Sequence, residues 1–220
     1  MARRRPAPPA PTARSAEPVL LALSPRELWR VHAGPYAPEQ FHPGGSGNAR
    51  FSPIADSRGK AIPTLYAASS VAAALMETVL HDVPTPPGDY ILDLARLEEA
   101  ALCVSVIQSR RPLLLIDLST KGLQRLGLTR RDLIDTPVRA YPTTRAWATW
   151  FHQVSPTAQG LLWTSRKDDD AKSILLYGDR VRAHTLKVVK PAQALISQWQ
   201  DVLLDVALHI GIHQVVGPHR

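Results

Sequence analysis

The sequence predicts an α+β fold, or one built on a mixed sheet, because many short strand-like runs lie between helical patterns. Strict alternation of strand and helix is missing, which argues against a doubly wound parallel sheet. The expected strands cover residues 28–32, 64–68, 90–94, 102–108, 113–118, 160–165, 173–177 and 182–189. The expected helices cover residues 70–81, 121–126, 130–134, 143–153 and 191–210.

The N-terminal segment differs in composition from the rest of the chain. Residues 1–18 are largely proline, alanine and arginine, so we expect a disordered basic tail there. Four arginines of this tail account for much of the net charge of +7, although attraction to phosphate-bearing ligands or an acidic partner stays open. Residues 19–220 are expected to form a single domain with a C-terminal helix.

Residues typical of turns interrupt the first part of this domain. Ser24 and Pro25 have the composition of a helix start, and the strand at residues 28–32 follows them. Residues 33–63 are rich in glycine and proline, so we expect a long loop that is functional or mobile.

The next elements follow from apolar spacing. After the strand at residues 64–68, Ser69 or Ser70 is expected to cap a helix that ends near His81. Runs rich in leucine, isoleucine and valine predict the later strands. The last helix is indicated by apolar residues at helical spacing, namely Leu195, Trp199, Val202, Leu203 and Val206.

Composition excludes several classes of protein. The single cysteine, Cys103, rules out an internal disulfide framework, and its apolar neighbours favour a place in the core. The nearly uncharged stretch at residues 61–80 contains Glu77, which argues against a membrane span. No signal peptide is visible, so we expect a soluble, cytoplasmic protein without membrane attachment. The eight histidines show no spacing typical of zinc, and we expect no metal site.

Three patterns hold side chains suited to chemistry. Arg30 lies within a strand-like run, where it either points to water or presents a fixed guanidinium to pyrophosphate. Glu77 is the only charged residue between positions 61 and 80, so its carboxylate must reach a partner or face a cleft. Ser165 ends a strand beside a cation, where an ordinary turn and a hydroxyl site both remain open.

Together these patterns resemble the RES domain family, which is named for its arginine, glutamate and serine. The resemblance extends from about Leu28 to about Val189, and the order and spacing of its motifs are more specific than any one of them. The matching motifs are Leu28-Trp29-Arg30-Val31, Asn48-Ala49-Arg50-Phe51-Ser52-Pro53, Thr64-Leu65-Tyr66-Ala67-Ala68, Ala74-Leu75-Met76-Glu77 and Gly160-Leu161-Leu162-Trp163-Thr164-Ser165-Arg166. Ala49 departs from the pattern, because the family usually has glycine before the second arginine.

The resemblance implies a split mixed β-sheet with flanking helices, similar to bacterial ADP-ribosyltransferase toxins. It implies a RES-like catalytic domain that uses NAD as its substrate and cleaves the nicotinamide–ribose bond by hydrolysis or phosphorolysis. It further implies the toxin of a type II toxin–antitoxin system, whose cognate helix-turn-helix antitoxin blocks the cleft. Whether the toxin and antitoxin form a larger oligomer stays open.

The chemistry of NAD suggests a role for each motif residue. Breaking the nicotinamide–ribose bond builds positive charge on the ribose, as in glycoside hydrolysis, and Glu77 would stabilise that charge. Arg30 and Arg50 would bind phosphate or ribose oxygens, and Tyr66 would stack on nicotinamide or shape its pocket. Ser165 would hydrogen-bond the ribose or orient Glu77. The expected catalytic residues are thus Glu77, Arg30 and Ser165, and the expected NAD-binding residues are Arg30, Arg50, Tyr66 and Ser165.

Two alternative functions remain at this point. An ADP-ribosyltransferase that modifies a cellular protein breaks the same bond, and the sequence does not identify the acceptor. A basic nucleic-acid-binding regulator would suit the net charge. However, no recognition-helix pattern is visible and much of the excess charge lies in residues 1–18, so we expect no direct nucleic-acid binding.

Overall fold

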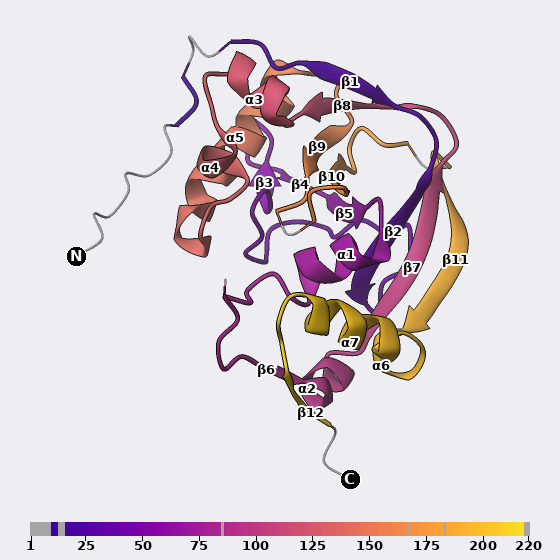
Figure 1. The fold of residues 1–220 in the computed structure, drawn as a ribbon. Coiled ribbons are helices and arrows are strands. Elements are labelled where there is room, and N and C mark those ends of the chain that lie inside the picture. The colour runs from indigo at the N-terminus through magenta and orange to yellow at the C-terminus, as the bar shows by residue number, and fades with distance from the viewer. Residues whose placement is uncertain (1–9, 13–15, 85, 167, 183, 218–220) are drawn as a thin grey trace, which may run out of the picture.

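A curled, mixed sheet forms the centre of the molecule (Figure 1). The computed structural model describes residues 10–12, 16–84, 86–166, 168–182 and 184–217, so the expected tail at residues 1–18 lies mostly outside the described residues. Within these ranges the main sheet has eight strands in the order β1–β8–β9–β10–β5–β2–β7–β11. Neighbouring strands are antiparallel except for the parallel pair β8–β9. The predicted α+β class with a mixed sheet is confirmed.

The strand bounds place most motif residues on this sheet. The main strands are β1 (Leu20–Leu23), β2 (Glu27–Ala33), β5 (Thr64–Ala68), β7 (Leu102–Ser109), β8 (Leu113–Asp117), β9 (Gly160–Thr164), β10 (Lys172–Tyr177) and β11 (Leu186–Ala194). Two small sheets pair β3 (Ile54–Ala55) with β4 (Ala61–Ile62), and β6 (Ile91–Asp93) with β12 (Gln214–Val216).

The helices flank the sheet in two groups, as Figure 1 shows. One group contains α3 (Thr120–Arg125), α4 (Arg130–Leu133), a short 3₁₀ turn (Val138–Ala140) and α5 (Tyr141–Val154). The other group contains α1 (Val71–Thr78), α2 (Leu94–Glu99), α6 (Leu195–Gln198) and α7 (Gln200–His209). Each group has its own apolar core, with Trp147 and Trp163 in the first, and Leu75 and Leu203 in the second. None of the helices in the described ranges is long and apolar enough to cross a membrane.

Helix α1 brings Glu77 to the sheet. Ser70 caps the helix, since its hydroxyl accepts a hydrogen bond from the Ala73 N–H at 3.1 Å, as one of the two predicted caps. The buried residues Ala73, Ala74, Leu75 and Met76 hold the helix against the apolar core. The helix ends at Thr78, earlier than the expected end near His81.

One expectation for the N-terminal part was wrong, and another needs a small change. Ser24 and Pro25 do not start a helix, because they join β1 to β2, and β1 pairs with β8 as an edge strand. Residues 33–63 are mainly loop as expected, but they also contain the short hairpin of β3 and β4.

Two further corrections concern later elements. The expected strand at residues 90–94 ends at Asp93, whose side chain accepts from the Arg96 N–H and caps α2. The boundary between the expected strand at residues 182–189 and the expected helix at residues 191–210 lies further along the chain. Strand β11 continues through Pro191 to Ala194, and α6 begins only after it. An edge strand tolerates proline, since one side of its backbone needs no partner, and the pairing of β11 with β7 shifts register at this point.

Candidate functional site

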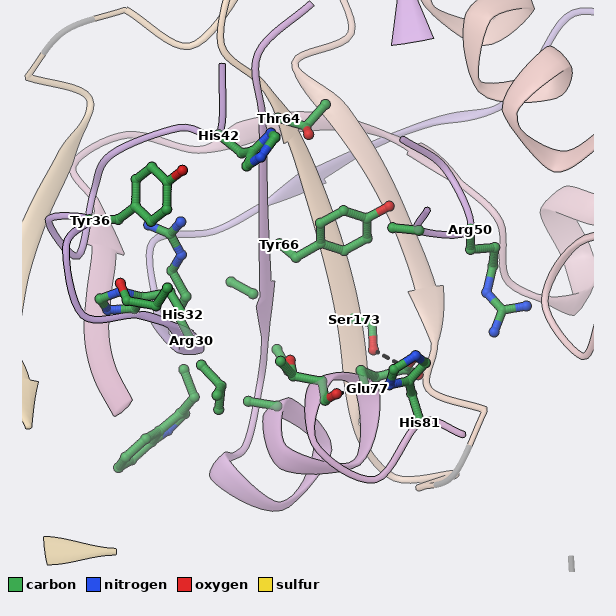
Figure 2. A pocket seen from close by; sticks show the side chains of 18 of the residues that line it. Arg30, His32, Tyr36, His42, Arg50, Thr64, Tyr66, Glu77, His81 and Ser173 are labelled. Atoms are coloured by element: carbon green, nitrogen blue, oxygen red, sulfur yellow. Dashed lines mark hydrogen bonds between the residues drawn. The ribbon is translucent and has the colours of Figure 1, made fainter. Parts of the chain in front are cut away.

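A cavity of about 470 Å³ opens where α1 meets β2, β5 and β10. Arg30, Arg50, Tyr66 and Glu77 all line it, although they come from four separate motifs. In the view of Figure 2, Arg30 and Arg50 lie on opposite sides of Tyr66, and Glu77 lies below it. The volume lies in the range of small-molecule sites. Ser165 joins this group through a hydrogen bond with Glu77.

Glu77 is held by donors from the turn that follows β9 and from β10. Its Oε1 accepts from the Ser165 hydroxyl at 2.9 Å, the Arg166 N–H at 3.1 Å and the Ser173 hydroxyl at 3.4 Å. Ser165 is fully buried. Hydrogen bonds to a charged acceptor are stronger than neutral ones. The carboxylate is thus fixed in orientation at the cavity wall.

Arg30 is buried on β2 and contacts the loop that follows this strand. Its Nη1 donates to the carbonyl oxygens of Pro38 at 2.7 Å and Ala37 at 3.2 Å. Burial lowers the pKa of Arg30 to about 10, and the charge of Glu39 offsets part of this effect. Arg30 therefore stays cationic at neutral pH and holds the loop against the cavity.

Arg50 is buried on the other side of the cavity. Its Nη1 donates to Thr136 Oγ1 at 2.8 Å and to the Thr136 carbonyl at 3.4 Å. Its guanidinium carbon lies 5.4 Å from the ring centre of Tyr141, within cation–π range. Burial lowers the pKa of Arg50, while Tyr141 and Glu77 act in the opposite direction. The position of the Arg50 guanidinium is thus fixed by contacts with residues that follow α4 in the chain.

Tyr66 forms part of the cavity wall between the two arginines. Its hydroxyl oxygen accepts from the Phe51 N–H at 3.1 Å and lies 3.4 Å from the Ser52 hydroxyl. Its ring meets that of Trp163 edge-on at 6.3 Å. Burial raises the pKa of Tyr66 to about 12, so the phenol stays protonated.

Comparisons with known proteins show which family this chain belongs to. The sequence model of the RES domain family matches residues 27–200. The chain belongs to the RES domain family. The predicted resemblance is therefore confirmed over most of its length.

A solved structure shares the fold of this RES domain. A chain from "Crystal structure of the M.tuberculosis MbcT-MbcA toxin-antitoxin complex" superimposes with a TM-score of 0.54 and 17% sequence identity. The match covers 89% of this chain and 93% of that chain. At this identity the likeness shows a common fold. The search of curated proteins found no match.

Three histidines of this RES domain line the cavity but were not predicted as site residues, namely His32, His42 and His81. His32 is the most buried, with hydrogen bonds at 3.0 Å to Ser105 Oγ and the Ala33 carbonyl. Burial lowers its pKa, the Ala33 bond raises it, and the nearby charge of Arg30 lowers it further. Because His32 follows Arg30 by two positions on a strand, the alternation of side chains could have placed both on one face.

Ser173 is a further cavity residue that the sequence did not predict. It lies opposite Trp163 in the pairing of β9 with β10, which brings its hydroxyl to Glu77. The expected strand at residues 173–177 contained it, but a serine at the start of a strand is no signal of function. A search of the described residues for three or more histidine, cysteine or acidic side chains that could hold a metal found no such group.

Proposed function

We propose that this RES domain is the toxin of a type II toxin–antitoxin system and cleaves the nicotinamide–ribose bond of NAD by hydrolysis or phosphorolysis. One observation carries the proposal: the Glu77 carboxylate, fixed by three donors, shares a cavity of about 470 Å³ with two buried guanidinium groups. Such a cavity suits a ligand that carries phosphates and develops positive charge during reaction.

Glu77 would supply the electrostatic stabilisation of the transition state. The nicotinamide leaves as a neutral base, so the ribose carbon becomes more cationic as the bond breaks. A carboxylate that is already fixed by Ser165, Arg166 and Ser173 would face this charge without reorganising. Water or phosphate would then attack the ribose carbon.

The other site residues would bind the rest of NAD. The pyrophosphate would lie near Arg30 and Arg50, whose planar groups suit phosphate oxygens. Tyr66 would offer its ring as a flat apolar surface to nicotinamide. Its hydroxyl is already bonded to the Phe51 backbone, which leaves the ring for this contact.

A cytoplasmic enzyme of this kind would need a partner that blocks its cavity. We propose a cognate antitoxin, supported by the fold likeness to a chain of a toxin–antitoxin complex. The helix-turn-helix type that we propose for this antitoxin comes from the family resemblance alone. If the antitoxin covers the cavity, then antitoxin and NAD exclude each other. A complex that binds NAD as tightly as the free chain does would contradict this part of the proposal. Slowed growth that is relieved by co-expression of the antitoxin would support it.

Incubation of the purified chain with NAD tests the reaction. We expect nicotinamide together with ADP-ribose or its 1-phosphate, and Glu77→Gln should abolish NAD loss while leaving the fold intact. Glu99→Gln is the matched control, because Glu99 is exposed on α2. A folded Glu77→Gln variant with wild-type activity would exclude Glu77 as the catalytic carboxylate. Label transferred to a protein would instead identify an ADP-ribosyltransferase.

A further inference from the structure

Arg130 contacts the backbone directly behind the Glu77 carboxylate. It is the first residue of α4, and its side chain reaches the end of β9. Its Nη1 donates to the Thr164 carbonyl at 3.2 Å and its Nη2 to the Ser165 carbonyl at 3.1 Å. Neither the motifs nor the family description gives this arginine a role.

The contact with Ser165 involves the same peptide group that binds Glu77. The Ser165 carbonyl and the Arg166 N–H belong to one planar peptide unit. Its oxygen accepts from the Arg130 guanidinium, and its N–H donates to Glu77 Oε1 at 3.1 Å. The arginine, the peptide and the carboxylate therefore form a continuous chain of two hydrogen bonds.

A cation at the oxygen end of a peptide strengthens the donor at its other end. Consecutive hydrogen bonds polarise one another, so the guanidinium makes the Arg166 N–H a better donor to the carboxylate. The same guanidinium also fixes the backbone that carries the Ser165 hydroxyl. Two of the three donors to Glu77 thus depend on Arg130.

Arg130 is itself held in place by Asp135, which follows its own helix. Its Nη2 lies 3.2 Å from Asp135 Oδ1, and the Asp135 N–H donates to the Arg130 carbonyl at 2.8 Å. Thr129 and Asp132 close the start of the helix with a capping box. These contacts reduce the number of rotamers that the long side chain can adopt.

We propose that Arg130 is a positioning residue that orients Glu77 through the Ser165–Arg166 peptide. This inference rests on the proposed function, because it gives Glu77 the catalytic role. Arg130 acts behind the carboxylate, so its loss lowers kcat for NAD cleavage and leaves KM near its wild-type value. A displacement of about 1 Å at a reacting group costs about 100-fold in rate, which sets the expected size.

The test compares Arg130→Met, Arg130→Lys and the control Arg131→Met in the full chain. Arg131 is the next residue of α4 and is exposed, and no hydrogen bond from it to β9 occurs among the described residues. We expect kcat to fall about 100-fold in Arg130→Met with KM retained. Arg130→Lys should recover part of the loss, since one ammonium keeps the charge but not the two-pronged geometry. Arg131→Met should match the wild type.

A readout without turnover separates this proposal from the proposed function. The Arg166 amide proton, observed by NMR, should move upfield in Arg130→Met and stay in place in Arg131→Met. If the wild-type chain leaves NAD intact, the proposed function fails, and the kcat proposal for Arg130 fails with it even where the amide shift confirms the hydrogen-bond chain. An unchanged amide shift, or a folded Arg130→Met variant with wild-type kcat, overturns the inference. A raised KM at constant kcat overturns it as well.

Discussion

The hydroxyl oxygen of Tyr66 lies 3.1 Å from the backbone nitrogen of Phe51, and this contact joins β5 to the segment that carries Arg50. Phe51 itself is fully buried. The two cavity residues Tyr66 and Arg50 are therefore linked through the Phe51 backbone, and paired variants are needed to separate the contributions that we propose for them in NAD binding.

Tyr66→Phe should lower the free energy of unfolding while leaving most of the NAD-cleaving activity. The variant keeps the ring but leaves the buried Phe51 N–H without this acceptor, which costs about 1–3 kcal/mol in the free energy of unfolding. Tyr66→Ala removes the ring as well and should raise KM for NAD further. Urea denaturation and NAD consumption, measured on both variants, test this difference. Equal KM values in the two variants would show that the ring does not contact the substrate.

Ser165→Ala should lower NAD cleavage more than Ser173→Ala. The Ser165 hydroxyl is 2.9 Å from Glu77 Oε1, whereas the Ser173 hydroxyl is 3.4 Å away. Loss of a hydrogen bond to a charged group costs about 1.5–3 kcal/mol, or roughly 10- to 150-fold in kcat where the bond persists in the transition state. Steady-state kinetics of both variants measure the ratio. A larger loss in Ser173→Ala would reverse the assigned order.

Arg30→Lys should impair NAD binding nearly as much as Arg30→Ala. Lysine retains the charge, but one ammonium cannot reproduce the planar guanidinium that contacts the Ala37 and Pro38 carbonyls and would face phosphate. We expect KM to rise about tenfold or more in both variants. The exposed Arg26 provides the control Arg26→Lys. Full activity of Arg30→Lys would reduce the role of Arg30 to a general positive field.

Protonation of His32 should make the fold less stable in mild acid. Its pKa is lowered in the folded chain below the ordinary value of 6.5, so the unfolded chain binds a proton first as the pH falls. The stability that neutral His32 contributes is complete above about pH 6.5 and is lost as the pH falls toward the folded-state pKa. Urea denaturation between about pH 5 and pH 8 measures this effect. The free energy of unfolding should depend more steeply on pH in the wild type than in His32→Gln. The exposed His213 provides the control His213→Gln.

Local sequence patterns predicted those parts of the fold that depend on neighbouring residues. Strand β5 matches its predicted bounds, and the Ser70 cap was one of two expected choices. The role of Asp93 as the cap of α2 was missed. An aspartate before a helical run is a local signal that could have identified this helix. Pro191 was misread as a helix start, because only the assembled sheet makes β11 an edge strand.

The candidate site was predictable where a residue type is unusual in its local surroundings. Glu77 stood out as a lone charge in an apolar stretch, and the cavity explains how the chain accommodates it. Ser173 and Arg130 gave no such signal, because serine near the start of a strand and arginine on a short helix are ordinary. Their closeness to the site comes from pairings between segments far apart in the chain, which no local pattern specifies.

The order in which the site is completed during synthesis follows from these pairings. The helix with Glu77 leaves the ribosome early, whereas its donors Ser165 and Ser173 are 88 and 96 residues further along. A nascent chain that stops before β10 contains the carboxylate and both arginines, but the cavity wall behind Glu77 is incomplete. A partly made chain therefore cannot assemble the complete site, and the time needed to translate those last residues is a built-in delay before the site can form.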